Sequence, residues 1–200
     1  MSCQYHHTKS EIDSFNGRIV QRVIDNGYSE TLGKLLAAQA NFESGHYCNP
    51  AFNEFNNLSG YKNYGSKPNQ YEVSIGNKAS DGGTYAGYAA LENSVDEILG
   101  WLEKRQKRGY VDISALVTPK DYVMKGLLAD PDYKWFTNGN QPPTQKQIDV
   151  YILGMSTISQ KLGYIYSQNK TLIDFTLFGI LTSGVFIYYY YRWGKSNHKF

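Results

Sequence analysis

Hydrophobic residues recur every three to four positions in five stretches of this chain, which is the spacing of an amphipathic α-helix. In the first stretch one face carries four apolar residues, Ile12, Phe15, Ile19 and Val23. The pattern predicts five helices, over 11–26, 30–44, 93–107, 118–129 and 144–166. Residues 45–90 are rich in Gly, Asn and Tyr, which predicts loops and a short hairpin.

The end of the chain has a different pattern. No charged residue occurs from Phe175 to Tyr191, and roughly 20 apolar residues are enough to cross a bilayer. Four consecutive tyrosines and a tryptophan, followed by basic residues, are typical of a membrane interface. We therefore predict a transmembrane helix over 171–193 and a basic tail over 194–200, with the lipid bilayer as a partner. A buried core helix is the alternative.

Length and composition limit the remaining choices. The 200 residues suit one domain and an appendage, predicted as a flexible tail over 1–10 and a folded domain over 11–168. A net charge of +2 and the lack of a phosphate-binding Gly loop argue against nucleic acid as a partner. Two Cys are too few for a disulfide framework, and no Cys/His cluster has metal-ligand spacing, so we expect no metal and no cofactor. No secretory signal peptide is predicted at the N-terminus.

One carboxyl group stands out at the end of the second predicted helix. Glu43 lies on the same helical face as the apolar Leu32 and Leu36, and Gly45 ends the helix just after it. An acid is electrostatically unfavourable at the negative end of a helix dipole. A carboxyl group with a raised pKa is what cleavage of a glycosidic bond requires. The alternative is an ordinary solvated Glu at a helix end.

Four short motifs follow one another along the chain. They are Ala38 with Glu43-Ser44-Gly45, then Asn-Asn-Leu-x-Gly over 56–60, the aromatic and acidic segment 85–98, and Leu-Leu-Ala-Asp-Pro-Asp-Tyr over 127–133. In this order they resemble the bacterial glucosaminidase family, peptidoglycan hydrolases of the lysozyme-like superfamily. The chain departs from the family at Gly45-His46-Tyr47, where Gly-Trp-Gly is usual, and at Ser59, where Phe is usual.

The resemblance implies an α+β fold: a mostly helical lysozyme-like domain with a small β-hairpin lobe, to which the C-terminal transmembrane helix is added. It implies that Glu43 is the general acid. It also implies that Glu72, on the hairpin, activates water or orients the 2-acetamido group of the substrate. Asp81 and Glu54 are rival candidates for this second carboxylate.

The resemblance also implies a set of substrate-binding residues. Tyr85 and Tyr88 match the family's aromatic pair, and Asn57 and Tyr61 belong to the loop beneath the expected site. Tyr rings stack on sugars and their hydroxyl groups bind sugar hydroxyls, so the eighteen Tyr suit a glycan ligand.

These residues lead to a functional hypothesis. The chain is expected to be a membrane-anchored peptidoglycan hydrolase of a bacterial envelope or a phage virion. It would cut the β-1,4 bond between GlcNAc and MurNAc as an endo-N-acetylglucosaminidase does. A muramidase, a lytic transglycosylase, or an inactive membrane-anchored protein that binds the cell wall are the alternatives.

Overall fold

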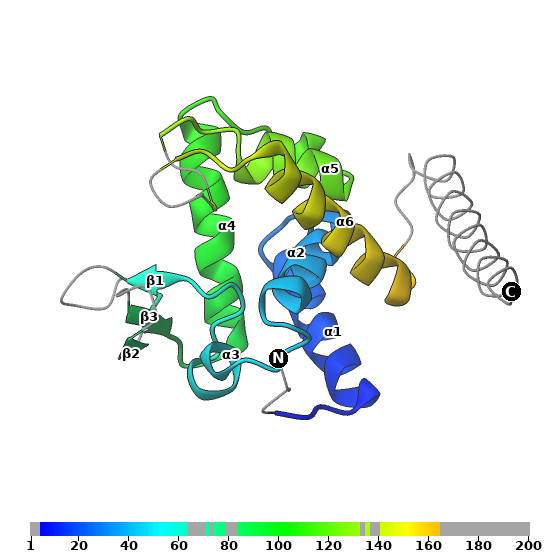
Figure 1. The fold of residues 1–200 in the computed structure, drawn as a ribbon, viewed down its shortest axis with the longest axis vertical. Coiled ribbons are helices and arrows are strands. Elements are labelled where there is room, and N and C mark those ends of the chain that lie inside the picture. Colours follow the sequence, from blue (N-terminus) through cyan, green and yellow to red (C-terminus); the bar gives the residue numbers. More distant parts are fainter. Residues whose placement is uncertain are drawn as a thin grey trace, which may run out of the picture. The chain divides into compact units, whose positions relative to one another are not determined.

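Six α-helices dominate the part of the chain that the computed structural model describes, which is residues 5–63, 71–72, 74–78, 84–132, 135–136 and 141–164 (Figure 1). The chain divides into two units, Met1–Ile165 and Tyr166–Phe200, and all described residues belong to the first. The helices are α1 (Lys9–Asp25), α2 (Glu30–Glu43), α3 (Pro50–Phe55), α4 (Leu91–Lys107), α5 (Pro119–Asp121) and α6 (Gln145–Lys161). A 3₁₀ turn, η1 (Ile113–Ala115), and a π-helical segment, η2 (Tyr122–Leu127), precede and follow α5.

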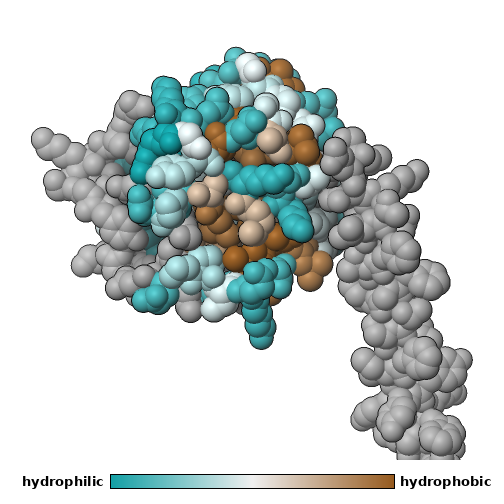
Figure 2. All heavy atoms as spheres, turned by 90° about the horizontal axis from the view of Figure 1, so that it is seen from above, coloured by the Kyte–Doolittle hydropathy of each residue, from teal (hydrophilic) through white to brown (hydrophobic). Residues whose placement is uncertain are grey.

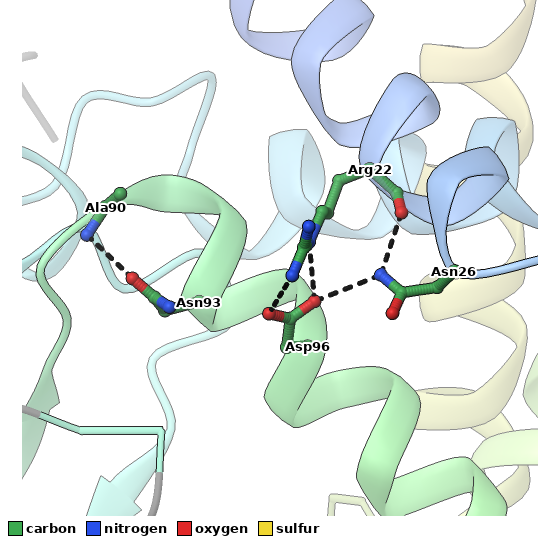
Figure 3. A network of polar contacts seen from close by, with 5 residues as sticks. All are labelled: Arg22, Asn26, Ala90, Asn93 and Asp96. Carbon is green, nitrogen blue, oxygen red and sulfur yellow. Dashed lines mark hydrogen bonds and ion pairs between the residues drawn. The ribbon is translucent and has the colours of Figure 1, made fainter.

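The helices begin where side chains can cap them. Thr8, Ser29 and Thr144 each accept a hydrogen bond from a backbone N–H of the first turn, as N-cap residues do. At the start of α4 the capping bond is reversed, because the Ala90 backbone N–H donates to Asn93 (Figure 3). The helices predicted over 11–26, 30–44 and 93–107 are confirmed as α1, α2 and α4. The helix predicted over 144–166 is confirmed as α6 but ends at Lys161, and 118–129 contains α5 and η2.

Helix α2 is the centre of the fold. From Leu32 to Asn41 all but one of its residues are buried, and it packs between α1 and α6. Gly33 lets α1 approach closely, since a Cβ added there would lie 3.0 Å from the Val20 Cα. A helix that is buried on so many sides must satisfy its polar end groups inside the protein.

Charged residues join α1 to α4. Arg22 donates from Nε and Nη2 to the two carboxylate oxygens of Asp96, at 2.8 and 2.7 Å, and Asn26 donates to the same carboxylate (Figure 3). Arg18 makes a second two-bond pair with Glu92. Paired N–H donors of this kind fix orientation as well as distance, so they set how α4 lies along α1.

Extended structure is limited to three short strands, β1 (Lys62–Asn63), β2 (Ser74–Lys78) and β3 (Thr84–Gly87). They pair antiparallel in the order β1-β3-β2, with Lys62 opposite Tyr85 and Ser74 opposite Gly87. Part of the segment predicted as loop and hairpin is helical instead. Asn49 caps α3 and Pro50 occupies its first turn, which is the favoured place for Pro in a helix.

The predicted fold class is wrong. It was an α+β lysozyme-like domain with a small β-hairpin lobe and one C-terminal transmembrane helix. The structure is mostly helical, and its strands hold only two, five and four residues. Within the described ranges no helix is long and apolar enough to cross a membrane. Helices α1, α4 and α6 have 17 residues each, whereas a span needs about 20 apolar residues. The segment 171–193 lies outside the described residues.

Some large apolar side chains remain on the surface. Met124 of η2 and Val150 and Leu153 of α6 are 41%, 55% and 54% exposed. Figure 2 shows apolar side chains among polar ones on the face seen from above. Val150 and Leu153 are three residues apart and therefore share one side of α6.

The contact between α2 and α6 generates a testable prediction at Gly154. A Cβ at this position would lie 2.2 Å from Phe42 Cε2, so Gly154→Ala forces the ring to move. Overpacking of this kind costs about 1–3 kcal/mol, and we expect urea unfolding to show that loss. Gly17→Ala is the matched control, because Gly17 lies in α1 with no atom within 4 Å of the added Cβ. We expect the control to gain up to about 1 kcal/mol in its free energy of unfolding, from helix propensity. An equal change in the free energy of unfolding of the two variants would contradict the close packing at Gly154.

Candidate active site

Glu43 is the last residue of α2, and its carboxyl group is enclosed by other side chains. Three groups donate to one oxygen, Oε1: the Trp135 indole Nε1 at 2.8 Å, the Gln39 amide Nε2 at 3.3 Å, and the Tyr151 hydroxyl. The other oxygen, Oε2, is buried and has no hydrogen-bond partner among the described residues. The carboxyl group is therefore asymmetric: Oε1 accepts three hydrogen bonds, and Oε2 accepts none from the described residues.

Burial raises the pKa of Glu43 to about 7, although the bonds from Tyr151, Trp135 and Gln39 each lower it. Burial is the larger effect because the charged form loses its hydration. The two phenols near the group stay neutral, since burial and the Glu43 charge hold the pKa values of Tyr151 and Tyr122 well above their usual range. Near neutral pH Glu43 thus carries a proton for part of the time, and Oε2 is the oxygen free to hold it.

Each donor comes from a different part of the fold. Gln39 precedes Glu43 by one helical turn in α2, and its carbonyl oxygen accepts from the Tyr122 hydroxyl. Tyr151 is brought close by the α2–α6 packing, where Phe42 contacts its ring at 5.0 Å. The Phe136 ring stacks parallel to the Tyr151 ring, with 4.6 Å between the ring centres. The position of the acid is thus fixed by contacts over a long range in sequence.

The chain leaves Glu43 through a left-handed turn. Gly45, His46 and Tyr47 have φ values of 60°, 61° and 62°, which side chains other than Gly rarely adopt. Tyr47 is fully buried there and donates its hydroxyl to Asn16 at 2.7 Å, while its backbone N–H donates to Ser44. These contacts offset the strain at a position where the family that the motifs resemble usually has Gly.

Aromatic rings extend from Glu43 along one side. The Trp135 indole meets Trp101 edge to face at 5.0 Å and Tyr61 at 6.2 Å. The Arg105 guanidinium lies 3.7 Å from the centre of the Trp101 ring. Trp101, Trp135 and Tyr61 are half-buried, and of the three Trp135 contacts the acid directly.

A second acidic group lies beyond Tyr61. Glu72 and Glu97 are 7% and 6% exposed, and the Tyr88 hydroxyl donates to Glu97. Burial raises the pKa of Tyr61, and the charges of Glu97 and Glu72 raise it further. The predicted residues Glu72, Tyr88 and Tyr61 thus lie close enough to influence one another, and Tyr61 connects them to Trp135.

The remaining predicted residues have other positions. Asn57 is fully buried and holds the loop by donating to the Tyr61 and Ala86 carbonyls, so it supports Tyr61 from beneath. Tyr85 of β3 lies beside Gly60, and no described bond or ring contact joins it to Glu43. Glu54 is exposed on α3 and accepts from Tyr5. Asp81 lies outside the described residues.

Several residues of this cluster are absent from the sequence-based prediction. These residues are Trp135, Trp101, Glu97 and Arg105. Trp135 donates to Glu43, Trp101 contacts Trp135, and the charges of Glu97 and Arg105 act on Tyr61. No local signal indicates them, because each contact crosses a long stretch of chain. Two signals were present in the sequence. Gln39 is four residues before Glu43, and Tyr151 places a hydroxyl on the apolar face of α6.

A metal centre and a reactive thiol are two other kinds of functional site. No group of three or more His, Cys, Asp or Glu residues suited to a metal occurs within the described parts of the chain. Cys48 is disulfide-bonded.

Comparisons of the chain with protein-family models, curated proteins and solved structures found no match.

The raised pKa of Glu43 predicts a pH-dependent stability difference. The folded chain binds this proton up to about pH 7, but the unfolded chain releases it near 4.5, so wild-type stability falls between these pH values. Glu43→Gln carries no such penalty. At pH 8 we expect its free energy of unfolding, measured with urea, to exceed that of wild type by roughly 3 kcal/mol. At pH 4 we expect this difference to disappear.

The exposed Glu54 provides the control for this measurement. Glu54→Gln removes a carboxyl group that is not buried, so its stability relative to wild type should differ little between pH 4 and pH 8. If the stability of Glu43→Gln relative to wild type is equally independent of pH, then Glu43 has an ordinary pKa in the folded protein.

Proposed function

We propose that this chain is a glycoside hydrolase that cleaves the glycan strands of peptidoglycan, with Glu43 as its general acid. The observation that carries the proposal is the enclosed Glu43 carboxyl group, whose pKa is raised to about 7 and whose Oε2 is left without a partner. The four motifs that resemble the glucosaminidase family supply the substrate class.

The asymmetry of the carboxyl group suits proton transfer. Because Oε2 is buried, a substrate has to displace some of the side chains around it; a proton on Oε2 can then be given to the glycosidic oxygen as the bond breaks. The negative charge that remains is shared with Oε1, where Trp135, Gln39 and Tyr151 already donate. The same carboxylate can then take a proton from the attacking water, since its donors hold it in place throughout.

The surroundings of the acid suit a sugar. The rings of Trp135 and Tyr61 suit stacking on a pyranose ring, and the Tyr61 hydroxyl can bond its hydroxyl groups. Glu72 and Glu97, whose charges raise the pKa of Tyr61, are the candidates for the second acidic group that most glycosidases need. Of the two, Glu72 is the one that the resemblance implicates.

Loss of the acid should abolish most activity. Glu43→Gln keeps the shape of the side chain but removes the proton that is transferred, so we expect turnover of purified peptidoglycan to fall by about a hundred- to ten-thousand-fold. Turbidity clearing and a cell-wall zymogram measure this loss. Glu54→Gln is the matched control and should retain wild-type turnover.

The outcome also decides between the functional classes. A Glu43→Gln variant with more than half of wild-type turnover would overturn the assignment of the acid. A wild-type chain that binds cell walls without cutting them would indicate an inactive binding protein. Mass spectrometry of the products identifies the bond: reducing-end GlcNAc for a glucosaminidase, reducing-end MurNAc for a muramidase, and 1,6-anhydro ends for a transglycosylase.

Replacement of Glu72 tests the second carboxylate. If Glu72 activates water, Glu72→Gln lowers kcat by at least about a hundredfold and leaves KM nearly unchanged. Glu97→Gln is the comparison, because Glu97 lies in the same acidic group and is bonded to Tyr88. An effect of Glu97→Gln alone would transfer the role to Glu97, and no effect of either variant would indicate a mechanism with one carboxylate.

A further inference from the structure

The loop that carries Trp135 is anchored by a buried carboxylate. Asp130 follows η2 and is 0% exposed. Arg108 donates from Nη1 to Asp130 Oδ2 at 2.9 Å, and Arg105 Nε lies 3.9 Å from the same oxygen. The backbone N–H of Asp132 donates to Asp130 Oδ1 at 3.0 Å. A fully buried carboxylate is stable only with such partners, so Arg105 of α4 and Arg108, the C-cap residue of α4, are both tied to this loop.

Two routes lead from Asp130 to the Trp135 indole. The first is the backbone: the turn closed at Asp132 is followed by a bond from the Trp135 N–H to the Leu127 carbonyl at 3.0 Å. The second runs through side chains, because Arg105 lies over Trp101 at 3.7 Å and Trp101 meets Trp135 edge to face at 5.0 Å. Each route restricts where the indole can lie.

We infer that Asp130 is a positioning residue for Glu43, because its ion pairs with Arg108 and Arg105 hold the Trp135 indole where its N–H donates to Glu43 Oε1. Asp130 takes no part in proton transfer itself. The inference deepens the proposed function in that Glu43 is taken as the acid, but the bond from Trp135 to Glu43 exists whatever reaction the chain performs.

The position of the indole sets the strength of the acid. The Trp135 bond favours the charged form of Glu43 and so lowers its pKa, against the larger effect of burial. The other titratable groups that face the carboxyl group are Tyr151 from α6 and Tyr122 from η2, and both are neutral phenols over the relevant pH range. Loss of the indole bond therefore raises the Glu43 pKa.

The sign of the shift separates positioning from a direct charge effect. Replacing Asp130 by Asn removes a negative charge, and through space alone this favours the ionised form of Glu43 and lowers its pKa. Displacement of Trp135 has the opposite effect and raises it. A rise in the Glu43 pKa can therefore not come from the missing charge.

The test is a titration of the Glu43 carboxyl carbon by ¹³C NMR in the full-length chain, with Glu43→Gln used to assign the signal. Trp135→Phe should raise the pKa by about one unit, the size expected from loss of a hydrogen bond to a charged group. Asp130→Asn should shift it in the same direction. The double variant should add little to Trp135→Phe, because both changes remove the same bond.

Two further variants complete the test, one expected to leave the Glu43 pKa unchanged and one expected to raise it. Asp132→Asn removes a charge from the same loop, but Asp132 is 65% exposed, so the Glu43 pKa should stay at its wild-type value. Arg108→Lys keeps the charge and loses the planar guanidinium, so it should raise the pKa without a change in charge. If Asp130→Asn does not fold, Arg108→Lys and Trp135→Phe decide the matter. An unchanged or lowered pKa in the folded variants would overturn the inference.

The titration is independent of catalysis, so the two proposals fail in different ways. An active Glu43→Gln variant would overturn the proposed function and leave the NMR shifts as they are. An absent shift in a chain that needs Glu43 for activity would overturn only the role of Asp130. Where both hold, the basic limb of the kcat–pH profile moves upward in Asp130→Asn by the same amount as the NMR pKa.

Discussion

A carboxyl group buried at the end of α2 is the constraint on which much of this structure depends. Such a group is stable only when neighbouring groups hydrogen-bond it or when it keeps its proton. For Glu43 both conditions apply, with donors from α2 itself, from α6 and from the loop after η2. The close packing of Phe42 on Gly154 brings α6 near enough to supply Tyr151, so the α2–α6 contact serves both the core and the acid.

The donors to Glu43 are uncharged, which matters for its chemistry. A nearby Lys or Arg would favour the ionised carboxylate, as Arg18 does where its hydrogen bonds lower the pKa of Glu92. Neutral N–H and O–H groups instead stabilise the charged form moderately and leave the pKa of Glu43 at about 7. The group can thus give up a proton and take one back, whereas a firmly paired carboxylate cannot.

The sequence predicted the helices well and the fold class poorly, for one physical reason. Helical periodicity is local, so Ile19 and Val23, or Leu32 and Leu36, mark their buried faces without knowledge of their partners. Strand pairing depends on residues that are far apart in the sequence, and so does the share of residues in strands relative to helices. Asn49 and Pro50 begin a helix inside the segment predicted as loop and hairpin, and the strands that form are short. The apolar pattern of 171–193 is likewise a local signal, and no described helix has it.

The sequence by itself determined that Glu43 would end a helix on its inward face, because the apolar spacing before it and Gly45 after it are both local. It also indicated Tyr61, Glu72 and Tyr88 through the order of the motifs. Only the tertiary structure decided that Trp135 and Tyr151 would bond the acid, that Glu97 would join Glu72, and that Asp130 would anchor the Trp135 loop. These contacts join residues far apart in the chain, and their formation depends on how the helices pack rather than on any spacing that a sequence displays.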